Sequence, residues 1–394
     1  MKRFTELSTV LALAALAAAS CNKHYGDLSE RPDPTGGTGG SGFGGAGGMG
    51  GRARGGSGGS AVTGGTAGKY MEPPGRSVTS FFHGIVDAER AVFCFARHDD
   101  AEPVLVGDPM PQGGLDFAAS FAFETLDDIE LETTPLLPYV IAGDLDLIDG
   151  MACDDAVEKA REEMDAVTTS ALGQGDGGAG GNDGGGGEGG APEPPPPPRL
   201  RVAALPEIPA GTLTQGYSSL YVAVGCLGGA AFTHALEDQA CGRAYSPSSP
   251  TATAQLVTLS RTRAFGKLSL QALHASLAAP ALAVWSYPPD IAVQTSVAIV
   301  FDLRRGALLP RQPSTQLSIT DYGVASPGWR AQASEGGTQL VSERWRDVLE
   351  RAGIEAFEEG RGYTLVVVGP NGHVANNGFW NDMAIGVVDN DPEM

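Results

Sequence analysis

Residues 270–285 have the sequence LQALHASLAAPALAVW: an apolar segment ends in His274, Ala279 follows five residues later, and a second apolar segment begins. Residues 78–94, VTSFFHGIVDAERAVFC, follow the same plan, with His83 at the end of the first segment and Ala88 five residues later. Apolar and β-branched runs between turn residues are typical of strands. The two stretches therefore predict two diverged copies of one β-domain.

The closing segments of the two copies also match. Gly216-Tyr217 precedes one apolar run and Gly362-Tyr363 precedes another. If each copy opens at its His strand and closes after its Gly-Tyr strand, the first unit spans 75–262 and the second spans 263–394. The Gly-, Asp- and Pro-rich stretch 175–198 is then a disordered insertion in a surface loop of the first unit, which loop-closure entropy tolerates.

The rest of the chain also favours strands, with two helices between them. We expect a helix from Asp154 or Asp155, which can cap it, to about Val167. A second helix is expected from Thr338 to Ala352, because Leu340, Val341, Trp345, Val348 and Leu349 have helical spacing. Further strands are expected at 253–260, 295–303, 317–320 and 384–388. The expected fold class is mainly β: two β-sandwich-like units with two short helices and long disordered Gly/Pro-rich segments.

Residues 270–284 resemble the opening of a family of uncharacterised bacterial extracellular β-sandwich domains. Members of that family begin with a strand, His-Ala-Ser-Pro, an Ala-Pro pair and a second strand, and Pro209-Ala210-Gly211-Thr212 matches a later step of theirs. The chain departs from them at Leu277, where they have Pro, and at Ala283, where they usually have Asp. The resemblance implies a β-domain at the cell surface and no known activity.

The first twenty residues have the parts of a secretory signal: Lys2 and Arg3, an apolar run, and small residues up to Ser20. Cys21 follows directly, as in the lipobox of bacterial lipoproteins, although Ala18 stands where the best matches have Leu. This resemblance implies cleavage of 1–20 and lipidation of Cys21. We therefore expect a protein anchored by lipid in the cell envelope, at the outer membrane or cell surface of a Gram-negative bacterium.

Residues 21–74 are expected to form a Gly-rich disordered tether, because they contain few side chains that could be buried. About 50 residues of flexible coil have an average reach of roughly 40 Å. The formal net charge is -21, and the removed segment carries +1, so the mature chain carries -22. Such a surface repels phosphate backbones, which argues against nucleic-acid binding. The expected partners are the membrane, through the lipid, and an envelope protein or a glycan.

Four cysteines remain once Cys21 is lipidated: Cys94, Cys153, Cys226 and Cys241. An even number in an oxidising compartment suggests disulfides, and four cysteines allow three pairings. We favour Cys94–Cys153 and Cys226–Cys241, because the stretch 175–198 separates these pairs. The first unit would then be cross-linked and the second not.

Several polar groups are candidates for functional sites. We interpret His83 and His274 as buried imidazoles that bond a turn backbone, because a catalytic site rarely needs duplication. We interpret Asp144–Gly150 as a strand with one acidic face and an Asp-Gly turn, rather than a calcium loop. Asp382 and Asp389-Asn390-Asp391 are expected to form a solvated acidic tail, and His98-Asp99-Asp100 with Glu102 an exposed loop. Exposed members of the set Trp285, Trp329, Trp345 and Trp380 could bind sugars, but Trp345 is expected in the core.

No catalytic constellation, metal site or cofactor motif is evident in the sequence. We therefore expect no enzymatic activity, no catalytic residues, no metal ligands and no cofactor. The expected function is structural, or binding of a ligand or partner. The alternatives are an envelope hydrolase with an Asp/Glu-based site, or a carbohydrate-binding surface protein.

Overall fold

The computed structural model describes nine segments, which belong to one compact unit that spans Gly68–Met394. They are residues 75–98, 102–123, 130–173, 198–229, 236–287, 296–311, 314–318, 328–375 and 381–392. The predicted signal segment 1–20, Cys21 and the tether 21–74 lie outside the described residues. The same holds for Asp99, Asp100, Trp380 and residues 175–197 of the predicted insertion.

The first half of the described chain forms two four-stranded sheets. Sheet 1 has the order β4-β1-β7-β8 and sheet 2 the order β3-β2-β5-β6. The strands of sheet 1 are β1 (Val78–Ile85), β4 (Ser120–Phe123), β7 (Ser218–Gly225) and β8 (Thr253–Leu259). Those of sheet 2 are β2 (Arg90–Arg97), β3 (Val104–Asp116), β5 (Leu136–Gly143) and β6 (Leu200–Ala204).

The second half repeats this arrangement. Sheet 3 has the order β12-β9-β16-β17, with β13 also paired to β9, and sheet 4 has the order β11-β10-β14-β15. The strands of sheet 3 are β9 (Leu268–His274), β12 (Leu308–Leu309), β13 (Thr315–Leu317), β16 (Gly362–Val368) and β17 (Ala384–Asp389). Those of sheet 4 are β10 (Leu282–Tyr287), β11 (Val297–Leu303), β14 (Gly328–Ala333) and β15 (Gln339–Arg344).

The two halves share one topology. In each, the strand that ends in His pairs in parallel with the strand that follows Gly-Tyr: β1 with β7, and β9 with β16. The other strand pairs are antiparallel. The mainly β fold expected from the sequence is confirmed. The boundary between units at residue 262 stays a prediction.

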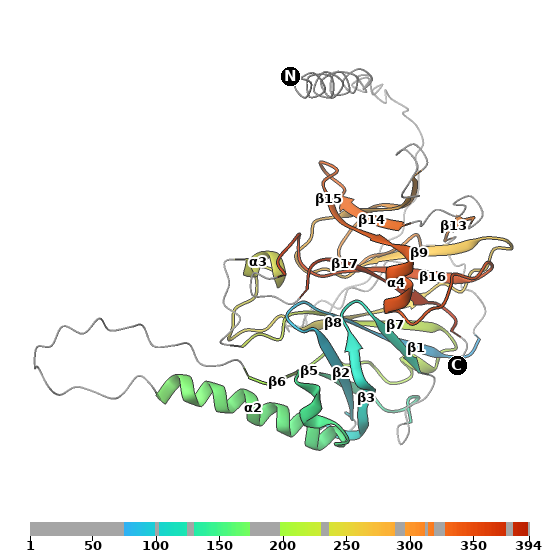
Figure 1. Ribbon diagram of the computed structural model, residues 1–394. Coiled ribbons are helices and arrows are strands. Elements are labelled where there is room, and N and C mark those ends of the chain that lie inside the picture. Colours follow the sequence, from blue (N-terminus) through green and yellow to red (C-terminus); the bar gives the residue numbers. More distant parts are fainter. Residues whose placement is uncertain are drawn as a thin grey trace, which may run out of the picture. The chain divides into compact units, whose positions relative to one another are not determined.

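The sheets stack in layers (Figure 1). One apolar core fills the space between sheets 1 and 2 and another the space between sheets 3 and 4. A third, which includes Phe82, Val222, Leu273 and Val366, joins sheet 1 to sheet 3. Strands β1, β7, β9 and β16 are buried at every residue, because they have a core on both faces.

Helix α2 (Cys153–Gly173) covers the outer face of sheet 2. Ala156, Val157 and Ala160 pack there against β2, β5 and β6, as the apolar stripe of an amphipathic helix should. Its start agrees with the helix expected from Asp154 or Asp155. Shorter helical segments are α3 (Glu237–Ala240), η1 (Leu145–Ile148) and η2 (Thr212–Thr214). No helix among the described residues is long and apolar enough to cross a membrane.

Two expectations about local structure are wrong. The predicted helix 338–352 is a strand, β15, followed by the short helix α4 (Trp345–Arg351). Pairing of β15 with β14 satisfies the backbone of the first half, and this tertiary gain outweighs the helical spacing. The strand predicted from Asp144 is instead the 3₁₀ helix η1, whereas the Asp149-Gly150 turn predicted after it is present. Strand β5 ends at Gly143, whose φ of 126° is the left-handed region that favours glycine.

Candidate binding surface

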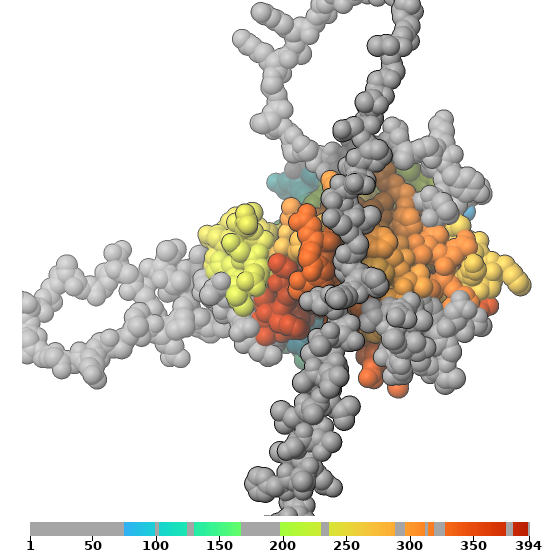
Figure 2. Space-filling model, turned by 90° about the horizontal axis from the view of Figure 1, so that it is seen from above, coloured from blue at the N-terminus to red at the C-terminus, as the bar shows by residue number. Residues whose placement is uncertain are grey.

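The outer faces of the two equivalent sheets 2 and 4 differ. Helix α2 buries Val92, Cys94 and Ile141 on the outer face of sheet 2. On sheet 4 the side chain of Phe301, in β11, is 62% exposed. Figure 2 looks onto this side of the molecule, where the orange strands of sheet 4 reach the surface. An exposed aromatic ring that belongs to a larger group of side chains on a sheet face marks a candidate binding surface.

Phe301 belongs to a group of stacked side chains. Its ring meets Trp285 of β10 edge-to-face, with 5.1 Å between the ring centroids. The guanidinium carbon of Arg330, in β14, lies 5.6 Å from the centroid of the same indole. Trp285 and Arg330 are directly opposed in the β10–β14 ladder, which fixes this contact. The indole thus holds both an aromatic ring and a cation at the surface.

Tyr287 extends the group across β14 to β15. Tyr287 lies two residues after Trp285, so both side chains are on one face of β10. Its hydroxyl is 2.5 Å from Oγ of Ser342. A β-carbon on Gly328, which opposes Tyr287, would lie 2.8 Å from this ring, so only glycine lets the ring lie flat across β14. We call Phe301, Trp285, Arg330, Tyr287 and Arg344 the aromatic–arginine strip.

Arg344 lies on the same face as Arg330. Arg344 opposes Gly328 in the β14–β15 ladder, two positions from Arg330. The neighbouring Glu343 faces the core side, where it accepts hydrogen bonds from Arg351 and from the backbone N–H of Ile385. Side chains alternate along a strand, so Arg344 points outward.

The two arginines of the strip differ from most others in the protein. Within the described part of the chain, neither Arg330 nor Arg344 has a carboxylate partner. Many other arginines do, including Arg90, Arg199, Arg201, Arg263, Arg304, Arg351 and Arg361. The strip is therefore a locally positive surface on an acidic protein.

Trp329 and Trp345 do not contribute to the strip. Trp329 and Trp345 are buried in the core of sheets 3 and 4, with their ring centroids 5.4 Å apart. Trp380 lies outside the described residues. Of the four tryptophans considered as sugar-binding groups, Trp285 is the one the structure places beside an exposed aromatic.

Phe301, Arg330 and Tyr287 have no sequence motif that marks them as functional residues. Their grouping depends on the order β11-β10-β14-β15, which joins residues from three strands. One signal was present: Trp285 and Tyr287 have the two-residue spacing that places both on one face of a strand.

His83 is fully buried at the end of β1. Its Nδ1 accepts the backbone N–H of Ile85 at 3.3 Å, so the proton is on Nε2, which donates to the carbonyl oxygen of Ala88 at 3.2 Å. Burial lowers the pKa of His83 to about 4, and the bond to Ala88 opposes this shift only in part. The ring is neutral, and its two hydrogen bonds stabilise the β1–β2 turn.

His274 occupies the equivalent place in sheet 3. It is also fully buried, and Nε2 donates to the carbonyl oxygen of Pro280 at 2.8 Å. Burial lowers its pKa, with a smaller opposing effect from that hydrogen bond. Both imidazoles bond a turn backbone, as the sequence interpretation had it.

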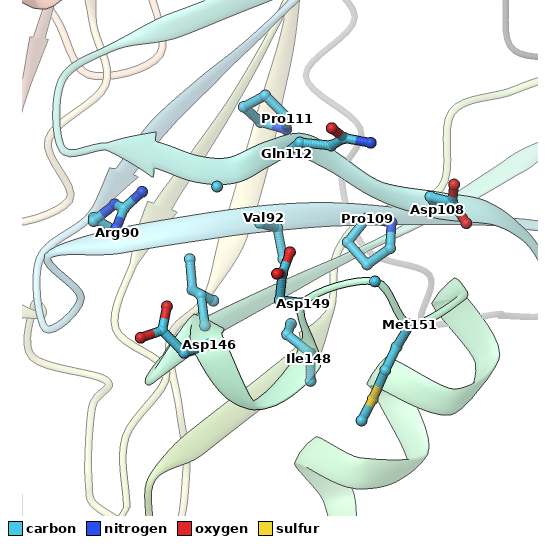
Figure 3. Close-up of a pocket in the computed structure, with 13 residues that line it drawn as sticks. Arg90, Val92, Asp108, Pro109, Pro111, Gln112, Asp146, Ile148, Asp149 and Met151 are labelled. Atoms are coloured by element: carbon cyan, nitrogen blue, oxygen red, sulfur yellow. The ribbon is translucent and has the colours of Figure 1, made fainter.

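The acidic segment around η1 borders a cavity of about 230 Å³ on the outer side of sheet 2. Arg90 and Asp146 lie at one end, Asp149 near the middle and Asp108 at the other end (Figure 3). The three carboxylates are thus spread along the cavity. No group of three or more potential metal ligands is found among the residues the structure describes.

The acidic groups near the C-terminus are not a solvated tail, so that expectation is wrong. Asp391 forms ion pairs with Arg76, Arg261 and Arg263. Asn390 is 1% exposed and Asp389 pairs with Arg361. Arginine side chains and the end of β17 hold these residues against the protein.

Asp382 and His98 are also paired. Burial raises the pKa of Asp382, but hydrogen bonds from Ala375, His373 and Val374 together outweigh it, and the pKa lies below its ordinary value. His98 bonds the carboxylate of Glu207. Among the described residues, neither Asp382 nor His98 belongs to a group of three or more potential metal ligands.

The four cysteines in the described part of the chain lie in two pairs. Cys94 and Cys153 have their Cα atoms 5.5 Å apart, and so do Cys226 and Cys241. This is consistent with the pairing expected from the sequence. The first pair joins β2 to the start of α2, and the second closes a loop after β7.

No family model and no curated protein sequence matches the chain. Among solved structures, a candidate adhesin from Bacteroides thetaiotaomicron aligns over 82% of this chain and 100% of its own, with 6% identity and a TM-score of 0.19. A similarity this low does not establish a shared fold, so the function has to be argued from the surface itself.

Proposed function

We propose that the chain is a lipid-anchored, non-enzymatic protein of the cell envelope that binds a glycan on the outer face of sheet 4. The observation that carries this proposal is the exposure of Phe301 against Trp285 and Arg330, on the face whose counterpart in sheet 2 is covered by α2.

The chemistry of the strip suits a sugar chain. The C–H groups of a pyranose ring carry partial positive charge, and the face of an aromatic ring is negative. Arg330 and the Tyr287 hydroxyl supply polar contacts beside the rings, and binding sites commonly combine apolar area with a few polar groups. The strip crosses four strands, about 14 Å at the usual strand spacing, so it fits an extended polymer.

Phe301→Ala tests this proposal on an array of immobilised polysaccharides. We expect the full chain to bind at least one polysaccharide and the variant to lose that binding about tenfold or more, because truncation of an exposed ring removes contact area without disturbing the core. Phe265→Ala is the matched control, since Phe265 is fully exposed in the turn 264–267, outside sheet 4. Absence of binding to every polysaccharide, or equal loss in both variants, contradicts the proposal.

The anchor is the second part of the proposal. It rests on the lipobox-like segment before Cys21 and on the acidic mature chain, which would leave the lipid as the main attachment to a membrane. Growth with a labelled fatty acid should label the wild-type chain and not Cys21→Ser. Equal labelling of the two would disprove lipidation at Cys21.

An envelope hydrolase is the second candidate. The observation in its favour is the cavity beside η1, which is lined by three carboxylates, Asp108, Asp146 and Asp149. Hydrolysis of a polysaccharide that stops in Asp146→Asn or Asp149→Asn would favour it over the non-enzymatic proposal.

A further inference from the structure

We infer that the glycan bound by the aromatic–arginine strip is acidic, a polysaccharide whose sugars carry carboxylates. This inference rests on the proposed function and names the ligand class of the same surface. A neutral sugar chain would use the rings of Phe301 and Trp285 but leave the positive charges of the strip without a partner.

Arg330 carries a positive charge at the centre of the strip. Its guanidinium packs against Trp285, and among the described residues no carboxylate neutralises it. The indole fixes the orientation of the guanidinium plane, which can then donate two parallel hydrogen bonds to a carboxylate.

Arg344 adds a second positive charge on the same face of sheet 4, next to Arg330. Arg330 and Arg344 are diagonal neighbours on adjacent strands, and such pairs are about 7–8 Å apart. That separation is measured at the backbone, and both side chains lie on the same face of the sheet, where an anion can interact with both positive charges. A polymer with a carboxylate on successive sugars supplies that anion and follows the strip in the same direction.

The charge of the strip is opposite to the net charge of the protein. The net charge of -21 disfavours adsorption of polyanions in general. Asp302, the acidic residue of β11, follows Phe301 in the sequence and pairs with Arg304. An acidic polymer should therefore bind only where arginines have no carboxylate partner. The strip contains two such arginines, Arg330 and Arg344, beside exposed aromatic surface.

A matched pair of ligands tests the inference: polygalacturonate and the same polymer after chemical reduction of its carboxyl groups. We expect the purified full chain to bind polygalacturonate at least tenfold more tightly than the reduced polymer. Arg330→Gln should lower binding of polygalacturonate about tenfold and leave binding of the reduced polymer unchanged. Arg346→Gln, which removes the same charge from helix α4 beyond the sheet, should change neither.

The outcomes separate this inference from the proposed function. Equal binding of both polymers, with loss of both in Phe301→Ala, overturns the acidic ligand and leaves glycan binding in place. Binding of neither polymer overturns the inference, and binding of no polysaccharide on the array overturns the proposed function as well. Oligothymidylate, a polyanion that also offers flat rings, is the third probe; tighter binding of it than of polygalacturonate overturns the inference.

Discussion

Gly386 of β17 lies directly against Phe82 of β1, at the junction of sheet 1 with sheet 3. A β-carbon at residue 386 would overlap the ring of Phe82 and the carbonyl oxygen of Ala118. The two sheets come this close because sheet 3 presents no side chain at that point. Gly84 makes a similar approach from the other side, where a β-carbon would lie 2.9 Å from Cγ1 of Val368.

Replacement of Gly386 by Ala should therefore loosen the junction of the two sheet pairs. Overpacking of a close-packed interior destabilises by about 1–3 kcal/mol, because the neighbours must shift. Urea unfolding of the purified chain measures this change. Gly362→Ala, in the paired strand β16, is the comparison: its β-carbon would have its nearest neighbour at 3.3 Å, and its effect should be smaller. Equal losses of stability in the two variants would show that the interior around Gly386 accommodates a β-carbon.

Burial of His83 makes the stability of the protein depend on pH. The pKa of about 4 in the folded state lies below the ordinary value of 6.5, so the unfolded chain binds the proton more tightly. The stabilisation from the neutral ring is complete above pH 6.5 and is lost as pH falls towards 4. The loss amounts to about 3 kcal/mol over this range.

Unfolding free energies measured between pH 7 and pH 4 test the contribution of His83. His83→Gln should remove part of the decline with falling pH, whatever its effect at pH 7. His274, whose pKa is also lowered by burial, should leave a second decline of the same sign in that variant. A profile of His83→Gln parallel to wild type would contradict the prediction.

The sequence predicts those features of the fold that depend on local spacing. His83 and His274, each followed by Ala five residues later, indicated the repeated strand pairs and the structural role of the imidazoles. The helix expected from Asp154 or Asp155 begins within two residues of the observed start of α2, and both aspartates lie in its first turn. Two of the strands with a core on both faces, β7 and β16, contain apolar runs, LYVAV and LVVV, that the sequence shows directly.

Features that depend on register or on distant partners were not predictable in this way. Leu340 and Val341 fit a helix by spacing, and only the neighbouring β14 makes them a strand. The strip of Phe301, Trp285 and Arg330 exists because β10 lies between β11 and β14. The contact of Asp87 with Arg201 joins residues 114 positions apart, and neither has a local signal.

That contact is a buried ion pair, which gives a third prediction. Asp87 is fully buried and receives hydrogen bonds from Arg201 at 2.5 Å and from the N–H groups of Leu227 and Gly228 at 2.9 Å. Arg201→Met should destabilise by about 3–5 kcal/mol, because a charged carboxylate loses its cation in the interior. Thermal or urea unfolding measures the loss.

The control for this pair is an exposed pair in the same region. Arg199, just before β6, binds Asp144, and both side chains are more than a third exposed. Arg199→Met should cost less than about 1 kcal/mol, because water screens the pair. In the Arg201→Met background, Asp87→Asn should recover stability, since an amide needs no counter-charge. Comparable losses for Arg199→Met and Arg201→Met would refute the distinction between the two pairs.

The two cysteine pairs should contribute unequally to stability. Cys94 and Cys153 are 59 residues apart in sequence, and Cys226 and Cys241 are 15 apart. In the chain-entropy model a disulfide restricts the unfolded chain more when the loop it closes is longer, which gives about 4 kcal/mol for the first pair and about 3 kcal/mol for the second. The Cys94 pair also fixes the start of α2 to β2, so its removal should expose the outer face of sheet 2. Double Ser variants of each pair test both statements. Urea unfolding compares the two losses of stability, and hydrogen exchange of the α2 amides reports whether the helix leaves sheet 2. If α2 exchanges no faster without Cys94 and Cys153, apolar packing alone holds the helix on the sheet.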